Sequence, residues 1–260
     1  MKKINSADSA TKEMLKIAQE ASIQTIWDRS ELQEPHCGFG ILGLCCKNCN
    51  LGPCRIDPFG EGAQYGVCGA DKDIIAARNL LRHTVAGSAC HNDHGRDLTL
   101  ALLALAEGKT EGYRIKAEDK LKEVAKEYGV SVENRPLNAI TKDLAEKILA
   151  EYGQQSGELV FVRRAPKKRR ELWRKLGIMP RGIDREITEA LSRTNIGVDN
   201  DYKSLVNATM KVALSDGWGG SMVATEISDV LFGLPEPVRS QANLGVLKED
   251  EVNIIVHGHV

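Results

Sequence analysis

Six of the seven cysteines of this chain lie within 32 residues, from Cys37 to Cys68. Such a density is typical of a disulfide framework or of a metal site. The first residues, MKKINSADSATKEMLK, carry charges where a signal peptide would need an apolar run of about 7 to 15 residues. We therefore expect a cytoplasmic chain whose thiols stay reduced and whose cysteine stretch binds metal.

The spacing of four of these cysteines is that of a ligand set for one 4Fe-4S cluster. Three follow at short intervals and a distant fourth closes the set, in the pattern C-x2-C-x4-C-x13-C: Cys46, Cys49, Cys54 and Cys68. Cys45 is the immediate neighbour of Cys46, and neighbouring side chains of an extended segment diverge. Cys45 is therefore poorly placed to serve the same cluster.

Cys37 and Cys45 then form half of a second set of four thiolates. A two-fold axis would supply the other half, because an isologous dimer places each patch against its copy. We predict one 4Fe-4S cluster within each chain and one shared across the axis of a homodimer. From spacing alone, one or two zinc sites are the alternative; the adjacent cysteines and nearby aliphatic residues favour iron: Ile41, Leu42 and Leu44.

The stretch CGFGILGLCCKNCNLGPCRIDPFG and the following GVCGADKDIIAARNLLRHTVAGSACHNDHGRD resemble the N-terminal region of the anaerobic nickel-iron carbon monoxide dehydrogenases. The likeness extends over essentially all 260 residues. This family also supplies one subunit of the carbon monoxide dehydrogenase/acetyl-CoA synthase complex. The resemblance implies that Cys37 and Cys45 ligate the cluster shared by two subunits and that the other four hold the second cluster.

Composition favours helices and excludes two classes of partner. Aromatic residues make up only 5% of the chain, and Ala, Leu, Glu and Lys are common, which favours helices over sheets. The net charge of -1 gives no bulk attraction to nucleic acid, and no run of about 20 apolar residues could span a membrane. We expect a mainly α, helical domain over residues 1–236 that carries the cysteine loop 37–68.

Several helices are predicted within that domain. An amphipathic pattern over 8–32 predicts a helix that covers the cysteine loop. Asp71 is a suitable N-cap for a helix that Gly87 would close, and Ser88 could cap the next, which Gly108 would stop. Further helices are expected over 116–128, 141–152, 184–192 and from 199 toward 232, the last with a turn at 217–220.

Two histidines lie on one face of the helix expected after Ser88. His91 and His94 share that face with leucines at three- and four-residue steps, so both should point inward. The pattern alone is typical of core histidines. The resemblance implies that His91 is an acid-base group beside the active metal cluster and that His94 continues a proton relay, which would then need Asp97 or water. The isolated Cys90 is expected to be a buried structural thiol.

The last residues change character. VNIIVHGHV, 252–260, has the pattern of a buried strand. The resemblance implies that this strand opens a Rossmann-like α/β domain, here 237–260, and that His259 ligates an iron of the nickel-iron-sulfur active cluster. A lone strand is not stable in isolation, so we expect this domain to be truncated. The remaining active-cluster ligands of the family are cysteines beyond this point, and the chain is expected to be inactive alone.

The resemblance implies the reversible oxidation of CO with water to CO2, two protons and two electrons. It further implies a ferredoxin-like electron carrier and, in some members, an acetyl-CoA synthase subunit as partners. Two alternatives stay open: a related hybrid-cluster protein, and a non-catalytic module that transfers electrons or binds zinc. The adjacent cysteines and the terminal HGH favour carbon monoxide dehydrogenase over the hybrid-cluster proteins.

Overall fold

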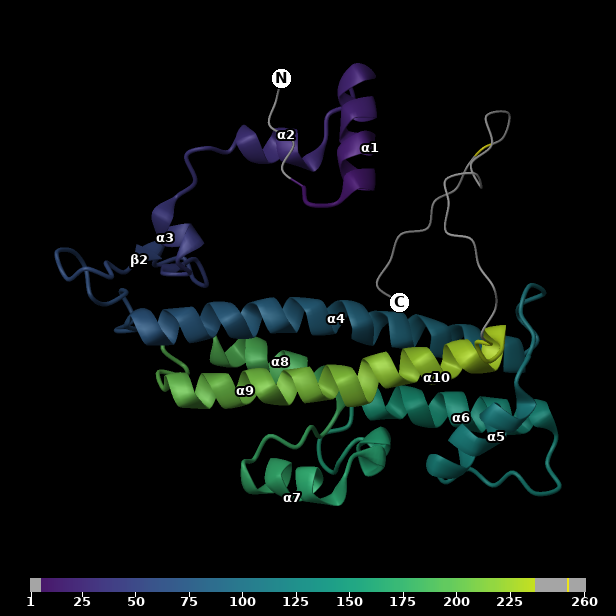
Figure 1. The fold of residues 1–260 in the computed structure, drawn as a ribbon. Coiled ribbons are helices and arrows are strands. Elements are labelled where there is room, and N and C mark those ends of the chain that lie inside the picture. Colours follow the sequence, from purple (N-terminus) through teal and green to yellow (C-terminus); the bar gives the residue numbers. More distant parts are fainter. Residues whose placement is uncertain (1–5, 237–251, 253–260) are drawn as a thin grey trace.

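The computed structural model of the chain describes residues 6–236 and 252. This part is mainly helical (Figure 1). The helices are α1 (Ser9–Glu20), α2 (Ile26–Glu31), α3 (Gly38–Ile41), α4 (Lys72–Ala106), α5 (Glu118–Glu127), α6 (Leu137–Tyr152), the 3-10 helix η1 (Val160–Arg164), α7 (Lys167–Lys175), α8 (Ile183–Arg193), α9 (Tyr202–Ser215), the π-helical segment η2 (Asp216–Gly220) and α10 (Ser221–Phe232). Two short strands are described, β1 (Cys45–Cys46) and β2 (Cys54–Arg55). The strand expected over 252–260, with His259, lies outside the described residues except for Val252.

Helix α4 is the central element of the fold. As predicted, Asp71 caps it, with Oδ1 accepting a hydrogen bond from the backbone N–H of Ile74 over 2.9 Å. The expected end at Gly87 is wrong, because α4 runs through this position and is 35 residues long. Gly87 is exposed, whereas Val85 and Ser88 on either side of it are buried against the bundle. Packing of this face outweighs the weak helix propensity of a single glycine.

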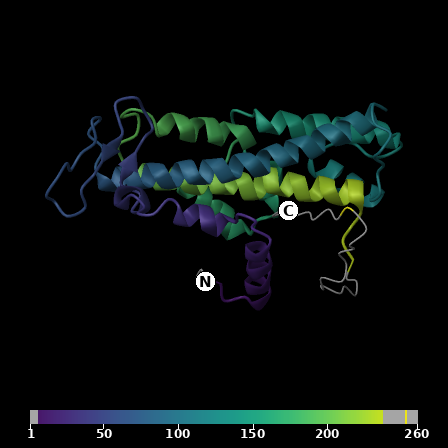
Figure 2. The same cartoon turned by 90° about the horizontal axis from the view of Figure 1, so that it is seen from above.

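Two rows of helices pack along α4 (Figures 1 and 2). One row is continuous, because α9, η2 and α10 follow each other beside α4 and run in the same direction. The turn expected over 217–220 is therefore wrong, since these residues belong to a π-helical segment that joins the two helices. The other row is formed by α6 and α8, which follow each other end to end and lie antiparallel to α4. Helix α6 begins at Leu137 and not at Thr141, whose hydroxyl donates to the carbonyl of Leu137 over 2.8 Å.

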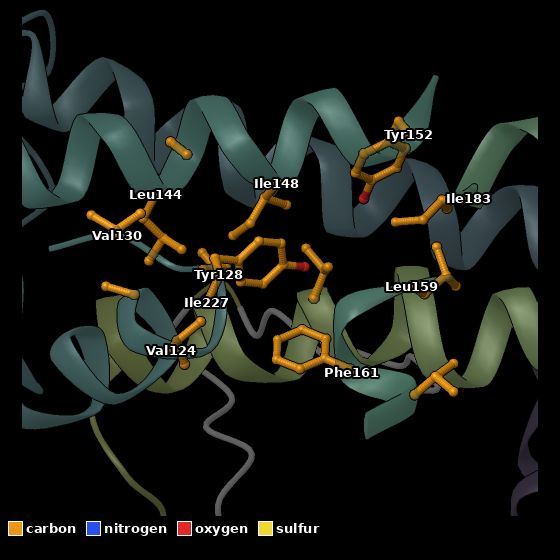
Figure 3. Close-up of a cluster of buried hydrophobic side chains, with 14 of the residues drawn as sticks. Val124, Tyr128, Val130, Leu144, Ile148, Tyr152, Leu159, Phe161, Ile183 and Ile227 are labelled. Carbon is orange, nitrogen blue, oxygen red and sulfur yellow. The ribbon is translucent and has the colours of Figure 1, made fainter. Parts of the chain in front are cut away.

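A buried apolar cluster joins α5, α6, η1 and α10 (Figure 3). At its centre the rings of Tyr128 and Phe161 meet edge to face, with centroids 5.4 Å apart. The buried hydroxyl of Tyr128 donates to Glu151 Oε2 over 2.7 Å. A second cluster lies at the other end of α4 and includes Cys46, Ile75 and Leu81. The cysteine stretch is thus packed onto the bundle through its own apolar core.

Glycines allow a close approach between α4 and η2. A Cβ atom at Gly95 would lie 2.6 Å from the carbonyl oxygen of Gly220, and one at Gly220 would lie 2.6 Å from Cα of Asn92. Neither distance is compatible with a side chain. The backbones of the two elements are therefore in direct contact at the middle of α4.

The segment before the cysteines differs from the prediction of one covering helix. It forms α1 and α2, separated by Ser22 in a left-handed conformation (φ 57°). A capping box starts α2, with Asp28 Oδ2 accepting from both N–H and hydroxyl of Thr25 over 2.8 Å. Neither helix has a buried residue, and both stand apart from the bundle (Figures 1 and 2). Among the described residues, no helix combines the length and apolarity needed to cross a membrane.

Candidate cluster-binding site

The two short strands bring distant cysteines together. Strands β1 and β2 pair antiparallel, with Cys46 opposite Cys54 and Cys45 opposite Arg55. Since successive side chains of a strand point to opposite faces, Cys45 and Cys46 are directed apart, as the sequence predicts. Cys46 is buried and Cys45 half-buried. The pairing therefore places Cys46 and Cys54 on one side of the loop.

One cavity is lined by all four members of the predicted quartet. Cys46, Cys49, Cys54 and Cys68 line it together with residues of α4 and of the loop after α8, which include Arg78, Thr194 and Ile196. Cys37 and Cys45, both among the described residues, do not line it. In the part of the chain that the structure describes, no three His, Cys, Asp or Glu side chains are arranged to hold a single metal ion.

The backbone around the cavity leaves little room for side chains. A Cβ atom at Gly52 would lie 3.0 Å from both the carbonyl oxygen of Cys46 and the amide nitrogen of Cys54. One at Gly66 would lie 3.5 Å from Cys54 Sγ. The backbone N–H of Val67 donates to Cys54 Sγ over 3.5 Å. Glycines here let the chain turn tightly and bring amide groups close to sulfur.

The sulfur of Cys68 faces a positive charge. Burial alone would raise the pKa of the Cys68 thiol. A hydrogen bond from Arg78 Nη1 to Sγ over 3.5 Å, together with hydrogen bonds from backbone amides, lowers this pKa by more than burial raises it. The pKa is lowered as a result. A lowered pKa favours the thiolate, which is the form that binds metal.

Two nitrogen donors that line the cavity have no protein partner. Asn48 Nδ2 and Arg78 Nε are both buried atoms without a hydrogen bond. Unpaired buried donors cost free energy unless an acceptor satisfies them. Four thiols and two unpaired donors around one cavity fit an anionic group with several sulfur atoms, such as a 4Fe-4S cluster.

The remaining two cysteines lie at the outer side of the loop. Cys37 is exposed and directly precedes α3, where the backbone N–H groups of Gly40 and Phe39 lower the pKa of its thiol. Asn79 of α4 anchors the segment before Cys46, because its Nδ2 donates to the carbonyl oxygens of Gly43 over 2.8 Å and of Cys45 over 3.1 Å. Cys37 is thus exposed and Cys45 half-buried, and both lie outside the quartet cavity.

A second group of polar residues lies near the middle of α4. Nδ1 of His91 lies 3.0 and 3.1 Å from the two carboxyl oxygens of Asp216, and the hydroxyl of Ser221 donates to Asp216 Oδ1 over 2.6 Å. Neither Asp216 nor Ser221 is a candidate site residue from sequence alone. The only sequence signal was the small-residue run that follows Asp216, GWGG, where the helix was expected to break.

The inward-facing arrangement predicted for His91 and His94 is wrong in part. Both side chains are half-buried, and the fully buried stripe of this half of α4 is made of other residues: Ser88, Asn92, Gly95, Thr99 and Leu102. These residues are buried because η2 and α10 approach α4 at glycines. Asp97 is exposed. Cys90 is exposed as well, which corrects the expectation of a buried thiol.

Comparison with known proteins identifies the family. The model of the Prismane/CO dehydrogenase family matches residues 44–260. The chain belongs to this family. The resemblance to carbon monoxide dehydrogenases seen in the sequence is thereby confirmed.

Members of this family are similar over nearly the whole chain. Carbon monoxide dehydrogenase 1 of Methanosarcina acetivorans is 56% identical over 98% of the chain. The subunit beta of carbon monoxide dehydrogenase/acetyl-CoA synthase of Moorella thermoacetica is 38% identical over 97%. The crystal structure of the Ni-free carbon monoxide dehydrogenase of Thermococcus sp. AM4 superposes with a TM-score of 0.89 and 48% identity, covering 94% of this chain and 39% of the other. The chain spans about 40% of the length of the curated relatives it matches.

Proposed function

We propose that this chain forms part of a nickel-iron carbon monoxide dehydrogenase and carries its iron-sulfur electron-transfer clusters and its dimer interface. The proposed overall reaction is the reversible oxidation of CO with water to CO2, two protons and two electrons. The observation that carries this proposal is the single cavity lined by Cys46, Cys49, Cys54 and Cys68. Family membership and the names of the relatives supply the reaction.

The four cysteines of the cavity would hold one 4Fe-4S cluster. When bound there, such a cluster supplies one-electron transfer. The chain prepares the site for it in three ways. The β1–β2 pair sets Cys46 opposite Cys54, glycines admit the backbone close to sulfur, and Arg78 favours the thiolate of Cys68.

Cys37 and Cys45 would contribute to a cluster shared with a second copy of the chain. Exposed apolar side chains lie between the two cysteines in sequence, since Ile41 is 70% exposed and Leu42 57% exposed. Burial of these residues against an identical patch would stabilise a homodimer. Cys37 and Cys45 would then meet their two symmetry mates at the axis.

His91 is the acid-base group of the proposal. The carboxyl group of Asp216 lies at hydrogen-bond distance from Nδ1 of His91 and orients the ring. We propose that the imidazole, held in this orientation, passes a proton to and from the active cluster. His94, one turn further along α4, is the proposed next member of a proton relay. His259 would ligate an iron of the nickel-iron-sulfur active cluster.

The proposed partners follow from the family. A ferredoxin-like carrier would accept the electrons. The relative from Moorella thermoacetica is named as a subunit of a complex with acetyl-CoA synthase, which makes such a subunit a further candidate partner for this chain. The relatives compared above are named carbon monoxide dehydrogenases, and this favours that activity over the hybrid-cluster alternative.

Metal analysis tests the cluster assignment. The protein is reconstituted with iron and sulfide under anaerobic conditions, and its metal content and the EPR spectrum of its dithionite-reduced form are measured. We expect iron and the EPR signals of reduced 4Fe-4S clusters, and we expect Cys68→Ser to lose the signal of the cluster within the chain. Cys90→Ser is the matched control, because Cys90 is exposed on α4 and lies outside both sets. Stoichiometric zinc without any EPR signal would contradict the proposal.

A CO assay tests whether the chain alone can oxidise CO. Six of the seven cysteines in these 260 residues are proposed ligands of the electron-transfer clusters, and the seventh is Cys90. The thiolates for an active cluster are therefore lacking in this sequence. We expect the reconstituted chain alone to show no CO-dependent reduction of a viologen dye, although dithionite reduces its clusters. Turnover with CO by this chain alone would refute the proposal that it carries the electron-transfer clusters without a complete active cluster.

A further inference from the structure

Arg78 is the most deeply buried charged side chain at the quartet cavity. It is 1% exposed, lies on the first part of α4 and lines the cavity with the four cysteines. Nη1 donates to Cys68 Sγ over 3.5 Å, whereas Nε is buried and unpaired. Asn48, between two of the cysteines in sequence, lines the same cavity with an unpaired Nδ2. Two residues that line the cavity with the four cysteines therefore supply one fixed positive charge and two unpaired donors.

We propose that Arg78, assisted by Asn48, sets the reduction potential of the cluster held by Cys46, Cys49, Cys54 and Cys68. This inference rests on the proposed function. Arg78 would hold the potential high by stabilising the reduced, more negative form. It acts on the cluster as a tuning residue and is not itself a ligand.

The direction of the effect follows from electrostatics. Reduction adds one electron from an external donor to the cluster and its thiolates, and no bond forms or breaks. The guanidinium stays protonated throughout, so its charge is constant. A positive charge in a buried site is weakly screened and stabilises the added negative charge. Hydrogen bonds to sulfur act in the same direction, because the reduced cluster is the better acceptor.

Arg78 also has a structural contact that the experiment must separate from its charge. Nη2 donates to the carbonyl oxygen of Asp199 over 2.8 Å and to Asn200 Oδ1 over 2.6 Å. These bonds fix the loop between α8 and α9 beside the cavity. Arg82, one turn further along α4, holds the same loop by donating to Thr194 Oγ1 over 2.7 Å, but it does not line the cavity. Arg82 is therefore the matched control.

The experiment is an EPR-monitored redox titration of the reconstituted wild-type protein and of Arg78→Met, Arg78→Lys and Arg82→Met. At any fixed potential we expect the ratio of reduced to oxidised cluster to fall about tenfold in Arg78→Met, equivalent to about 59 mV for a one-electron couple. Arg78→Lys, which keeps the charge but loses the Nε donor, should show a smaller fall. Arg82→Met should leave the ratio at the wild-type value.

A wild-type potential in Arg78→Met, with iron content retained, overturns the inference. An equal fall in Arg82→Met would show that loop position and not the cavity charge sets the potential, and this also overturns it. If Arg78→Met does not retain iron, the potentials of Arg78→Lys and Asn48→Leu test the inference in its place. A wild-type potential in both variants contradicts tuning by these donors. Failure of the wild-type protein to bind a 4Fe-4S cluster refutes the proposed function itself. That outcome is distinct from an unchanged potential in loaded variants.

Discussion

Nδ1 of His91 lies 3.0 Å from Oδ1 of Asp216, although 125 positions separate the two residues in the chain. The contact depends on the π-helical segment η2, which begins at Asp216 and brings it against the middle of α4. Ser221, at the start of α10, donates a hydrogen bond to the same carboxyl oxygen. π-Helical turns within longer helices are frequent at functional sites.

Removal of the Asp216 carboxylate should change the tautomer of neutral His91. In the wild-type protein we expect the hydrogen on Nδ1, because the carboxylate can only accept. Asp216→Ala should give a mixture of tautomers or the Nε2–H form. Long-range ¹⁵N–¹H NMR correlation of the histidine rings distinguishes these forms. Asp93→Ala, on the exposed side of α4, is the control and should leave His91 unchanged. A wild-type pattern of His91 shifts in Asp216→Ala would contradict the proposed orientation.

Two glycines of the bundle should respond to alanine in opposite directions. Gly220→Ala places Cβ 2.6 Å from Cα of Asn92, so we expect a loss of about 1–3 kcal/mol in the free energy of unfolding from overpacking. Gly87→Ala meets no atom within 4 Å and lies in the exposed face of α4, so we expect a gain of about 0.5–1 kcal/mol. Urea denaturation followed by circular dichroism measures both. Equal effects of the two substitutions would contradict the close contact between α4 and η2.

Glu189 should make the protein sensitive to acid. Burial alone would raise the pKa of this carboxyl, but hydrogen bonds from Arg181 and Arg193 outweigh it and lower the pKa to about 2. Between pH 4.5 and about 2 the unfolded chain then binds more protons at this position than the folded chain. Its contribution to stability is complete above pH 4.5 and is lost as the pH falls through this window.

The variant Glu189→Gln isolates this contribution. At neutral pH we expect it to lower the free energy of unfolding by about 1–3 kcal/mol, as for hydrogen bonds to charged groups. The difference from the wild-type protein should shrink as the pH falls toward 2. Thermal unfolding across this pH range measures it. Glu171→Gln is the control with an effect below about 0.5 kcal/mol, since the pair of Glu171 with Lys167 is exposed. A difference independent of pH would be inconsistent with the lowered pKa.

The two cysteine sets should be separable by iron content. With one cluster per chain and one shared per dimer, we expect about six iron atoms per chain in the reconstituted protein. Cys45→Ser should reduce this to about four, because the shared cluster is lost while the quartet is intact. Sedimentation analysis should show whether the dimer persists without the shared cluster. Loss of all iron in Cys45→Ser would mean that Cys45 serves the quartet.

The grouping of the cysteines around the cavity could be predicted because it depends on short-range spacing. Cys46, Cys49 and Cys54 are close in sequence, and the distant Cys68 is brought back by a loop rich in glycine. The roles of Arg78 and Thr194 could not be found in this way. They reach the cavity only because α4 and the end of α8 pack together, and no local pattern encodes that contact.

Helix boundaries and buried faces were predicted less well, for a common reason. Gly87 was expected to end a helix, and residues 217–220 to form a turn, because glycine has a low helix propensity. In the structure each lies inside a longer helical run that tertiary packing sustains. The buried stripe of α4 was assigned to His91 and His94 from their spacing with leucines. It shifts onto Asn92 and Gly95 because the glycines of η2 allow a closer neighbour than the sequence of α4 alone indicates.

Helix α4 passes without interruption from Arg78 at the cysteine cavity to His91 beside Asp216. His91 follows Arg78 by thirteen positions in one helix, a distance of about 20 Å along its axis. The bundle thus fixes both the spacing and the relative rotation of the two sites. A single residue inserted between them would turn one by about 100° relative to the other, so this interval tolerates substitution far better than a change in length.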